Sequence, residues 1–234
     1  MKGKIVIKIG GSLLFTENSK INPKKIIEFR DIIKENPDYE NLVIVCGGGK
    51  IAREYINAVR SFQGNEALCD SFGIEISRIN SKLIIAAWGD AYPQVPKTIE
   101  KLSLAILFKN PIIMGGLQPG QSTTSVALEV AEYIGADQLV ILTDVDGIYD
   151  KDPKKFDDAK LIKNMSYDDL QELIFNFSGD KQAAAGEYRI FDTVSLQILK
   201  RSTINVIVMS GKDFNEFKKL WNGEKDIEGT IITD

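Results

Sequence analysis

Short, mostly apolar segments alternate with longer segments of helical periodicity along this chain, and this alternation limits the possible folds most. The segments predicted as strands are Ile5–Ile9, Leu42–Cys46, Ile112–Met114, Leu139–Leu142, Val206–Met209 and Thr230–Ile232. Because their apolar residues are consecutive, these strands are expected to be buried on both faces. Such strands, separated by helices, are typical of a parallel sheet covered on both sides. The sequence therefore predicts an α/β fold with a central, mostly parallel sheet.

Segments of helical periodicity fill the gaps between the predicted strands. The first begins at Asn22-Pro23, a capping residue followed by a proline in the first turn. The others are expected at 50–62, 67–87, 122–134, 167–175, 193–201 and 214–221. We expect the helix at 67–87 to be interrupted near Gly73. Segments 88–97 and 177–187 are the expected flexible parts.

The composition excludes several classes of function. The chain has 234 residues and no histidine, which removes Ser–His and Cys–His catalysis and His-ligated zinc. A net charge of −4 gives no overall attraction to nucleic acid or to an anionic membrane. Two cysteines, Cys46 and Cys69, are too few for a four-thiolate metal site and favour a reducing cytoplasm.

No apolar run is long enough to span a membrane. The basic and then apolar N-terminus faintly resembles a signal peptide. Lys8 interrupts its apolar run and no small-residue cleavage site follows, so we interpret it as the first strand.

Glycine-rich segments follow four of the predicted strands. They are Gly10-Gly11-Ser12, Gly47-Gly48-Gly49, the segment 115–121 and Thr143-Asp144-Val145-Asp146-Gly147. Parallel α/β sheets bind ligands beyond the carboxyl ends of their strands. We therefore expect these four segments to meet at one edge of the sheet and to form a single site.

The triple glycine at 47–49 is compatible with phosphate binding, because its backbone N–H groups are unshielded and a helix begins after it. It also matches a loose dinucleotide fingerprint, but the required acid would be Asp70, which lies in a helical segment instead of at a strand end. A Walker A loop is excluded because Ile51 stands where Ser or Thr is needed. Taken alone, the loop is equally compatible with an ordinary strand-to-helix turn.

Lys8 is the most informative single residue. It interrupts an apolar strand next to a Gly-Gly turn, where an ammonium group would meet phosphate oxygens. Arg53, in the first turn of the next helix, is placed to clamp a phosphate, and Asp70 to accept hydrogen bonds from a ribose. The plainer alternatives are an outward-facing lysine, a solvated arginine and a surface acid.

Four aspartates, Asp144, Asp146, Asp150 and Asp152, cluster after one strand. No glutamate closes a calcium loop at the required spacing, so these residues are either turn formers or part of the site. Tyr149 offers a ring and a hydroxyl to a nucleotide, or simply packs. Cys46 and Cys69 are interpreted as buried packing residues.

These motifs together resemble the amino acid kinase superfamily and, within it, the uridylate kinases of the archaeal type. The resemblance extends from Lys4 to Thr233. The motifs that carry it are Lys8-Ile9-Gly10-Gly11-Ser12, Gly47-Gly48-Gly49 with Arg53, Asp70-Ser71-Phe72-Gly73, Gly116-Leu117-Gln118-Pro119-Gly120-Gln121-Ser122-Thr123, and Thr143–Tyr149 running to Asp152-Pro153.

The resemblance implies a three-layer α/β/α sandwich formed by a single domain over residues 1–234. The N-terminal part would hold the acceptor UMP, and the C-terminal part would hold ATP. It further implies transfer of the ATP γ-phosphoryl group to UMP with Mg²⁺, giving UDP and ADP for pyrimidine synthesis. The expected assembly is a homohexamer built as a trimer of dimers.

The resemblance also implies residue roles. The expected catalytic residues are Lys8, Arg53 and Asp192, the last orienting Lys8. The expected ATP-binding residues are Gly10, Gly11, Ser12, Gly49, Arg53, Thr143, Tyr149 and Asp152. The expected UMP-binding residues are Gly48, Asp70, Leu117, Gln118, Pro119, Gly120, Gln121, Ser122 and Thr123. No protein metal ligand is expected.

Two departures from the family pattern affect these roles. Bacterial relatives place an aspartate where Thr124 stands, so a second acid to orient Lys8 is expected to be missing. Lys181 lies where many members have a second lysine, but its alignment is not fixed and it is left out of the site.

Three alternatives to UMP kinase activity are each less well supported by the sequence. An isopentenyl phosphate kinase needs a histidine, which this chain lacks. An acetylglutamate kinase needs a cationic acceptor pocket, whereas segment 117–123 is uncharged. A nucleotide-binding storage or regulatory protein would not need the cation at Lys8.

Overall fold

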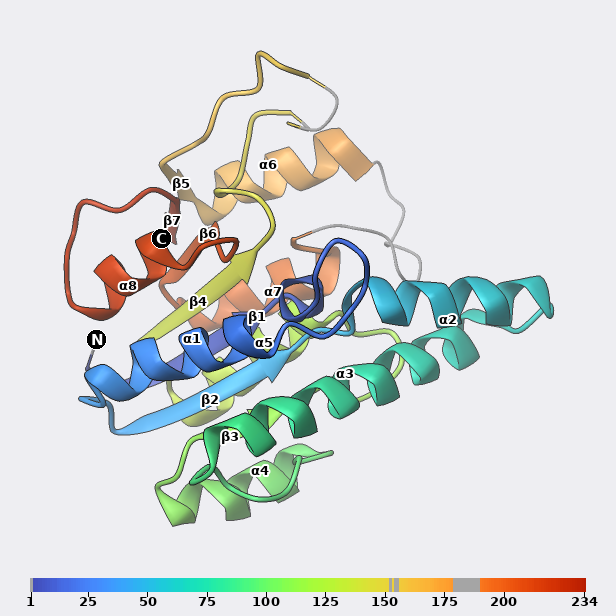
Figure 1. Ribbon diagram of the computed structural model, residues 1–234. Helices are drawn as coiled ribbons and strands as arrows, with labels where there is room; N and C mark the ends of the chain where they lie inside the picture. The colour runs from blue at the N-terminus through green and yellow to red at the C-terminus, as the bar shows by residue number, and fades with distance from the viewer. Residues whose placement is uncertain (1, 152, 154–155, 179–189) are drawn as a thin grey trace.

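The computed structural model describes residues 2–151, 153, 156–178 and 190–234 (Figure 1). These residues form a seven-stranded sheet in the order β3-β2-β1-β4-β6-β7-β5. The strands are β1 Lys4–Ile9, β2 Asn41–Cys46, β3 Ile112–Met114, β4 Gln138–Thr143, β5 Asn164–Ser166, β6 Val206–Ser210 and β7 Thr230–Thr233. All neighbouring strands are parallel except β6 and β7. The predicted mostly parallel sheet is confirmed.

Helices cover both faces of this sheet (Figure 1). They are α1 Pro23–Glu35, α2 Gly49–Ser61, α3 Glu66–Trp88, α4 Ile99–Ala105, α5 Thr123–Ile134, α6 Tyr167–Ser178, α7 Thr193–Ser202 and α8 Asn215–Trp221, with short 3-10 turns η1 Gly11–Leu14 and η2 Ile106–Phe108. One buried cluster joins the sheet to α4, α5, α6 and α7, and a second joins it to α1, α3 and α8. The three-layer sandwich is therefore confirmed.

Aromatic rings fill the second cluster. Phe29 of α1 stacks on Phe217 of α8 with ring centroids 5.7 Å apart, and it meets Trp88 of α3 edge-on at 6.3 Å. Phe29, Phe217 and Trp88 are each almost fully buried. Rings of this size dominate the hydrophobic contribution of a core, so this cluster anchors α1, α3 and α8 to one face of the sheet.

Two local predictions from the sequence are wrong. Helix α3 continues through Gly73 without a break, because one glycine inside a long packed helix costs only about 1 kcal/mol relative to alanine. Segment 88–97 is anchored, since Tyr92 N donates to Pro111 O at 2.9 Å and Lys34 pairs with Asp90 at 2.6 Å. The other predicted flexible segment, 177–187, lies mostly outside the described residues.

The strand register brings the glycine-rich segments to one level. Ile9, the last residue of β1, pairs with Cys46 of β2 and with Leu142 of β4, and Val45 pairs with Met114 of β3. The turns after these four strands therefore start side by side at the carboxyl edge of the sheet, as predicted.

None of the helices within the described ranges is long and apolar enough to cross a membrane.

Candidate active site

The turns after β1 and β2 interlock so tightly that only glycine fits. A Cβ added to Gly11 would lie 2.2 Å from Gly47 O and 2.5 Å from Gly49 N. Gly49 has φ +68°, and a Cβ there would lie 2.4 Å from the carbonyl carbon of Gly11. Both positions need glycine, one for space and the other for space and backbone conformation as well. The result is a surface of bare backbone beside the N-terminus of α2.

Lys8 lies near the carboxyl end of β1, between Val45 of β2 and Ile141 of β4 in the register. Val6, on the same face of β1, packs in the cluster that contains α5, so the Lys8 side chain starts on the α5 side of the sheet. The residue is partly exposed at its surface. Protein nevertheless surrounds its ammonium, and this burial lowers the pKa of Lys8 from 10.5 to about 8.

Two neighbours partly oppose this lowering of the Lys8 pKa, first Cys46 and then Asp144. Burial raises the pKa of the Cys46 thiol to about 12, so at neutral pH that group is uncharged. The charge that favours the Lys8 ammonium near neutral pH is therefore the carboxylate of Asp144, which follows β4. From the sequence, Asp144 was expected to be either a turn former or part of the site, and its effect on Lys8 was not predicted.

Asp192 is almost fully buried and joins two helix N-termini. Its Oδ1 accepts hydrogen bonds from Ser195 N at 2.7 Å, closing the capping box of α7, and from Ser125 Oγ at 2.9 Å. These bonds tie α7 to the first turn of α5, next to Thr124. The role of Asp192 in orienting Lys8 stays a prediction, and the structure adds a capping role that was not expected.

Arg53 projects from the first turn of α2 and is partly exposed. Within the described part of the chain it has no hydrogen-bond or ion-pair partner, unlike Arg60 of the same helix, which pairs with Glu66 at 2.7 Å. An unpaired guanidinium beside the glycine turns retains all its donors for an anion.

The predicted acceptor segment follows β3 and packs against α3. Gly120 N donates to Asp70 Oδ2 at 2.8 Å, so the structure brings together two residues that the sequence had assigned to UMP. Gln121 Nε2 donates to Glu129 Oε2 at 2.9 Å, and Ser122 caps α5. The remaining members, Leu117, Gln118, Pro119 and Thr123, belong to the same connection and its first helical residue.

Helix α3 contributes three polar residues that sequence reasoning missed. Ser77 Oγ accepts a hydrogen bond from Gly116 N at 2.8 Å, Arg78 donates to Gly116 O and Leu117 O, and Asn80 donates to Gly47 O. The sequence alone does not single them out, because α3 also carries other charged residues such as Glu66, Asp70 and Lys82. Without the fold, nothing indicated that they face the glycine turns.

The predicted ATP side follows β4. Thr143 is buried at the end of the strand, and Tyr149 Oη donates to Asp146 Oδ2 at 3.1 Å. Burial, with a smaller influence from Asp146, raises the pKa of Tyr149 above its usual value, so its hydroxyl remains a donor at neutral pH. Asp152, also predicted to bind ATP, and Lys181 lie outside the described residues.

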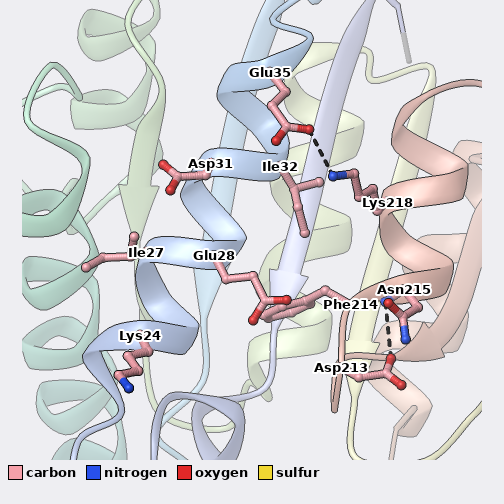
Figure 2. Close-up of a pocket in the computed structure, with 10 residues that line it drawn as sticks. All are labelled: Lys24, Ile27, Glu28, Asp31, Ile32, Glu35, Asp213, Phe214, Asn215 and Lys218. Atoms are coloured by element: carbon pink, nitrogen blue, oxygen red, sulfur yellow. Dashed lines mark hydrogen bonds and ion pairs between the residues drawn. The ribbon is translucent and has the colours of Figure 1, made fainter.

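A separate groove of about 330 Å³ lies between α1 and α8 (Figure 2). Charged side chains from both helices line it, and Lys218 pairs with Glu35 across it at 3.1 Å. It contains none of the residues predicted to bind either nucleotide.

The family model for the amino acid kinase family matches residues 3–210. This chain belongs to the amino acid kinase family. Among similar members of the family is the uridylate kinase of Methanobrevibacter smithii, which is 44% identical over 95% of this chain and 96% of its own length. The uridylate kinase of Thermococcus kodakarensis is 40% identical over 98% of this chain and 99% of its own.

Solved structures of family members agree with this assignment. The uridylate kinase of Archaeoglobus fulgidus matches with a TM-score of 0.81 and 33% identity, covering 98% of this chain and all of that one. The UMP kinase of Ureaplasma parvum matches with the same TM-score at 21% identity over 100% of each chain, and this second match supports the amino acid kinase fold alone.

Proposed function

We propose that this chain is a uridylate kinase that transfers the γ-phosphoryl group of ATP to UMP, giving UDP and ADP. The observation that carries the proposal is the position of Lys8, a lysine near the end of β1 beside the interlocked glycine turns. Near-full-length similarity to several uridylate kinases supports the choice of UMP as acceptor.

The site suits a transition state in which negative charge spreads over a phosphoryl group in transit. Such a reaction requires positioning and positive charge more than covalent help from the protein. In this proposal Lys8 neutralises the transferring group, and Gly11 and Ser12 supply backbone donors. Gly10 holds the turn against β4, since its N–H donates to Leu142 O at 2.9 Å. Arg53 binds phosphates between the two nucleotides, with Gly48 facing UMP and Gly49 facing ATP.

The acceptor side carries the choice of a neutral base. Segment 117–123 has no charged residue. An acceptor that carries carboxylates, such as acetylglutamate, would require a cation there. In this proposal Asp70 accepts hydrogen bonds from the ribose hydroxyls, and its bond to Gly120 N ties the segment to α3. On the donor side, Thr143, Tyr149 and Asp152 line the ATP pocket.

Magnesium would enter with ATP, held mostly by phosphate oxygens and water. In the ranges that the structure describes, no group of three His, Cys, Asp or Glu side chains is placed to hold a metal ion unaided. Magnesium would neutralise charge on the transferring phosphates, while Lys8 acts from the protein side.

The proposed assembly is a homohexamer in the cytoplasm. A trimer of dimers needs two different contact surfaces, and two groups of exposed apolar side chains are our candidates for them. One is a stripe along α3 formed by Leu68, Phe72 and Ile79, which are 46%, 38% and 57% exposed. The other, formed by Leu104, Leu107 and Phe108, lies at the end of α4 and in η2.

Free thiols at Cys46 and Cys69 are compatible with a reducing compartment.

A substrate panel tests the proposal. The purified chain is given ATP and Mg²⁺ with UMP, CMP, dUMP, acetylglutamate, carbamate or isopentenyl phosphate separately, and ADP release is measured. We expect UMP to support the highest kcat/KM. A tight ATP complex that releases no ADP with any acceptor would instead identify a nucleotide-binding regulatory protein.

A further inference from the structure

One turn of α3 contacts two segments proposed to hold the acceptor, the glycine turn after β2 and the segment after β3. Asn80, which is 3% exposed, donates its Nδ2 to Gly47 O at 2.9 Å and to Gly48 O at 3.3 Å. Arg78, with a side chain 12% exposed, donates Nε to Gly116 O at 3.1 Å and a terminal nitrogen to Leu117 O at 3.0 Å. The same short stretch of helix thus holds the phosphate turn and the nucleoside segment.

The bonds made by Asn80 help to set which way two peptide groups face, and for Gly48 O they act together with a bond from Ala52 N at 3.5 Å. In a planar trans peptide, the carbonyl of one residue and the N–H of the next point in opposite directions, and no cis peptide occurs among the described residues. Holding Gly47 O and Gly48 O toward α3 therefore turns the N–H groups of Gly48 and Gly49 away from α3. Within the described residues, neither N–H has a protein acceptor. Two adjacent donors at the start of α2 are thus left available for an anion.

The bonds made by Arg78 act on the nucleoside segment instead. Its planar guanidinium holds two successive carbonyls, and its third nitrogen pairs with Glu75 at 2.6 Å, which fixes the plane of the fork. Ser77 adds a bond to Gly116 N at 2.8 Å. A Cβ on Gly115 would lie 2.5 Å from Ser77 Oγ, so the segment lies directly on the helix.

We propose that Asn80 and Arg78 are positioning residues of the kinase site. Asn80 aims the Gly48 and Gly49 N–H groups at the phosphates, and Arg78 sets the position of the segment that receives the nucleoside. The proposal rests on the proposed function, because it takes UMP as the acceptor. In this arrangement Asn80 acts on phosphate binding and Arg78 acts on nucleoside binding, although both residues lie on one turn of α3.

The test compares ligands that differ only in their phosphate. Dissociation constants of UMP and uridine, and of ATP and adenosine, are measured for the wild type and three folded variants, together with kcat and KM. Asn80→Leu keeps the approximate shape and removes the donor without adding charge. Arg78→Lys keeps the charge and removes the fork. Ser81→Ala is the matched control, since Ser81 is equally buried and donates only to Ser77 O of its own helix among the described residues.

We expect Asn80→Leu to lower the ratio of the uridine dissociation constant to the UMP dissociation constant about tenfold, because the lost affinity belongs to the phosphate. The same variant should also have a lower kcat. Arg78→Lys should weaken UMP and uridine by about the same factor, a few-fold, with the KM for ATP unchanged. Ser81→Ala should behave as the wild type. A merely structural role would change the folded fraction and leave these ratios intact.

Different results overturn different proposals. An unchanged UMP ratio in folded Asn80→Leu, or an equal loss in Ser81→Ala, would overturn the role of Asn80. A variant Arg78→Lys with normal affinity for uridine would overturn the role of Arg78. If Asn80→Leu does not fold, Asn80→Ser provides the same comparison, because its hydroxyl is too short to reach both carbonyls. If the wild type shows no turnover with UMP, the proposed function fails, and the ATP-to-adenosine ratio still tests Asn80 through Gly49.

Discussion

Lys8 combines a cost to folding with the charge that the proposed reaction needs. Its pKa falls from 10.5 to about 8 through burial, which corresponds to a destabilisation of the folded chain by about 3 kcal/mol near neutral pH. Asp144 offsets the loss of hydration only in part. A structural residue would not be kept charged in this position, so the placement of Lys8 is itself an argument for function.

Replacement of Lys8 by methionine should therefore separate stability from activity. Lys8→Met removes the buried ammonium, so we expect the free energy of unfolding near neutral pH to rise by about 1–3 kcal/mol. The same change should lower kcat by roughly 10²-fold or more, because a preorganised cation is lost from the transition state. Denaturant titration and steady-state kinetics measure the two effects. A variant with near-normal kcat would contradict the catalytic role of Lys8.

The stability gain in Lys8→Met should also depend on pH. Between about 8 and 10.5 the folded wild type releases the Lys8 proton while its unfolded chain still holds it. The wild type therefore gains stability over this range, and the advantage of Lys8→Met should shrink as pH rises. An advantage that stays constant over the range would show that burial does not lower the pKa of Lys8.

The pKa of Lys8 also predicts how activity changes with pH. The kcat/KM for ATP reports the free enzyme, so it should fall as pH rises through about 8, where the ammonium loses its proton. Bound phosphates favour the charged form, so kcat should fall only at higher pH. Any active Lys8→Arg enzyme should lack this decline, since guanidinium stays charged. A wild-type kcat/KM that is constant up to the ordinary lysine value of 10.5 would contradict the assignment.

At the scale of helices and strands, local pattern predicted most of the fold. Continuous apolar runs identified six of the strands, and the Asn22-Pro23 cap placed the start of α1. Strand β5 was missed because Asn164–Ser166 is three residues long and polar at both ends. Helix α4 was missed because its boundary depends on one capping bond, from Lys101 N to Thr98 Oγ1.

Only those parts of the candidate site that a short sequence motif marks could be predicted. Glycine after a strand is visible in the sequence, so the turns at Gly11 and Gly49 were found. The polar turn of α3 and the carboxylate of Asp144 were not, since their importance depends on contacts across the fold. The bond from Ser125 Oγ to Asp192 likewise joins residues 67 positions apart.

Two glycines provide a test of how the turns interlock. Gly11→Ala would place a Cβ 2.2 Å from Gly47 O, a backbone atom that cannot move freely, so we expect a loss of stability of about 1–3 kcal/mol and a strong loss of activity. Gly73→Ala is the control. It lies inside α3 with only a side-chain contact at 3.4 Å, and should stabilise the chain by about 1 kcal/mol. Thermal and denaturant unfolding of both variants measure the contrast. Equal effects would contradict the close approach at Gly11.

At the scale of the whole molecule, the arrangement of layers places residues that support the site and one of the two proposed contact surfaces on the same helix, α3. One face of α3 holds the glycine turns through Asn80, and another carries the apolar stripe of Leu68, Phe72 and Ile79. Pairing of two copies along this stripe would hold α3 rigid at the point where it supports both turns. Self-association and activity are therefore expected to be linked.

Disruption of the α3 stripe should therefore lower both molecular mass and activity. Ile79→Lys places a charge on a side chain that is 57% exposed, so the monomer should fold normally while the pairing surface loses its apolar contact. Light scattering after size exclusion should show a wild-type hexamer and a smaller species for Ile79→Lys, with a raised KM for UMP. Ile21→Lys is the control, because Ile21 is 49% exposed and lies before α1, outside the α3 stripe. An unchanged mass in Ile79→Lys would exclude the stripe as a contact surface, and a monomeric wild type would exclude the hexamer.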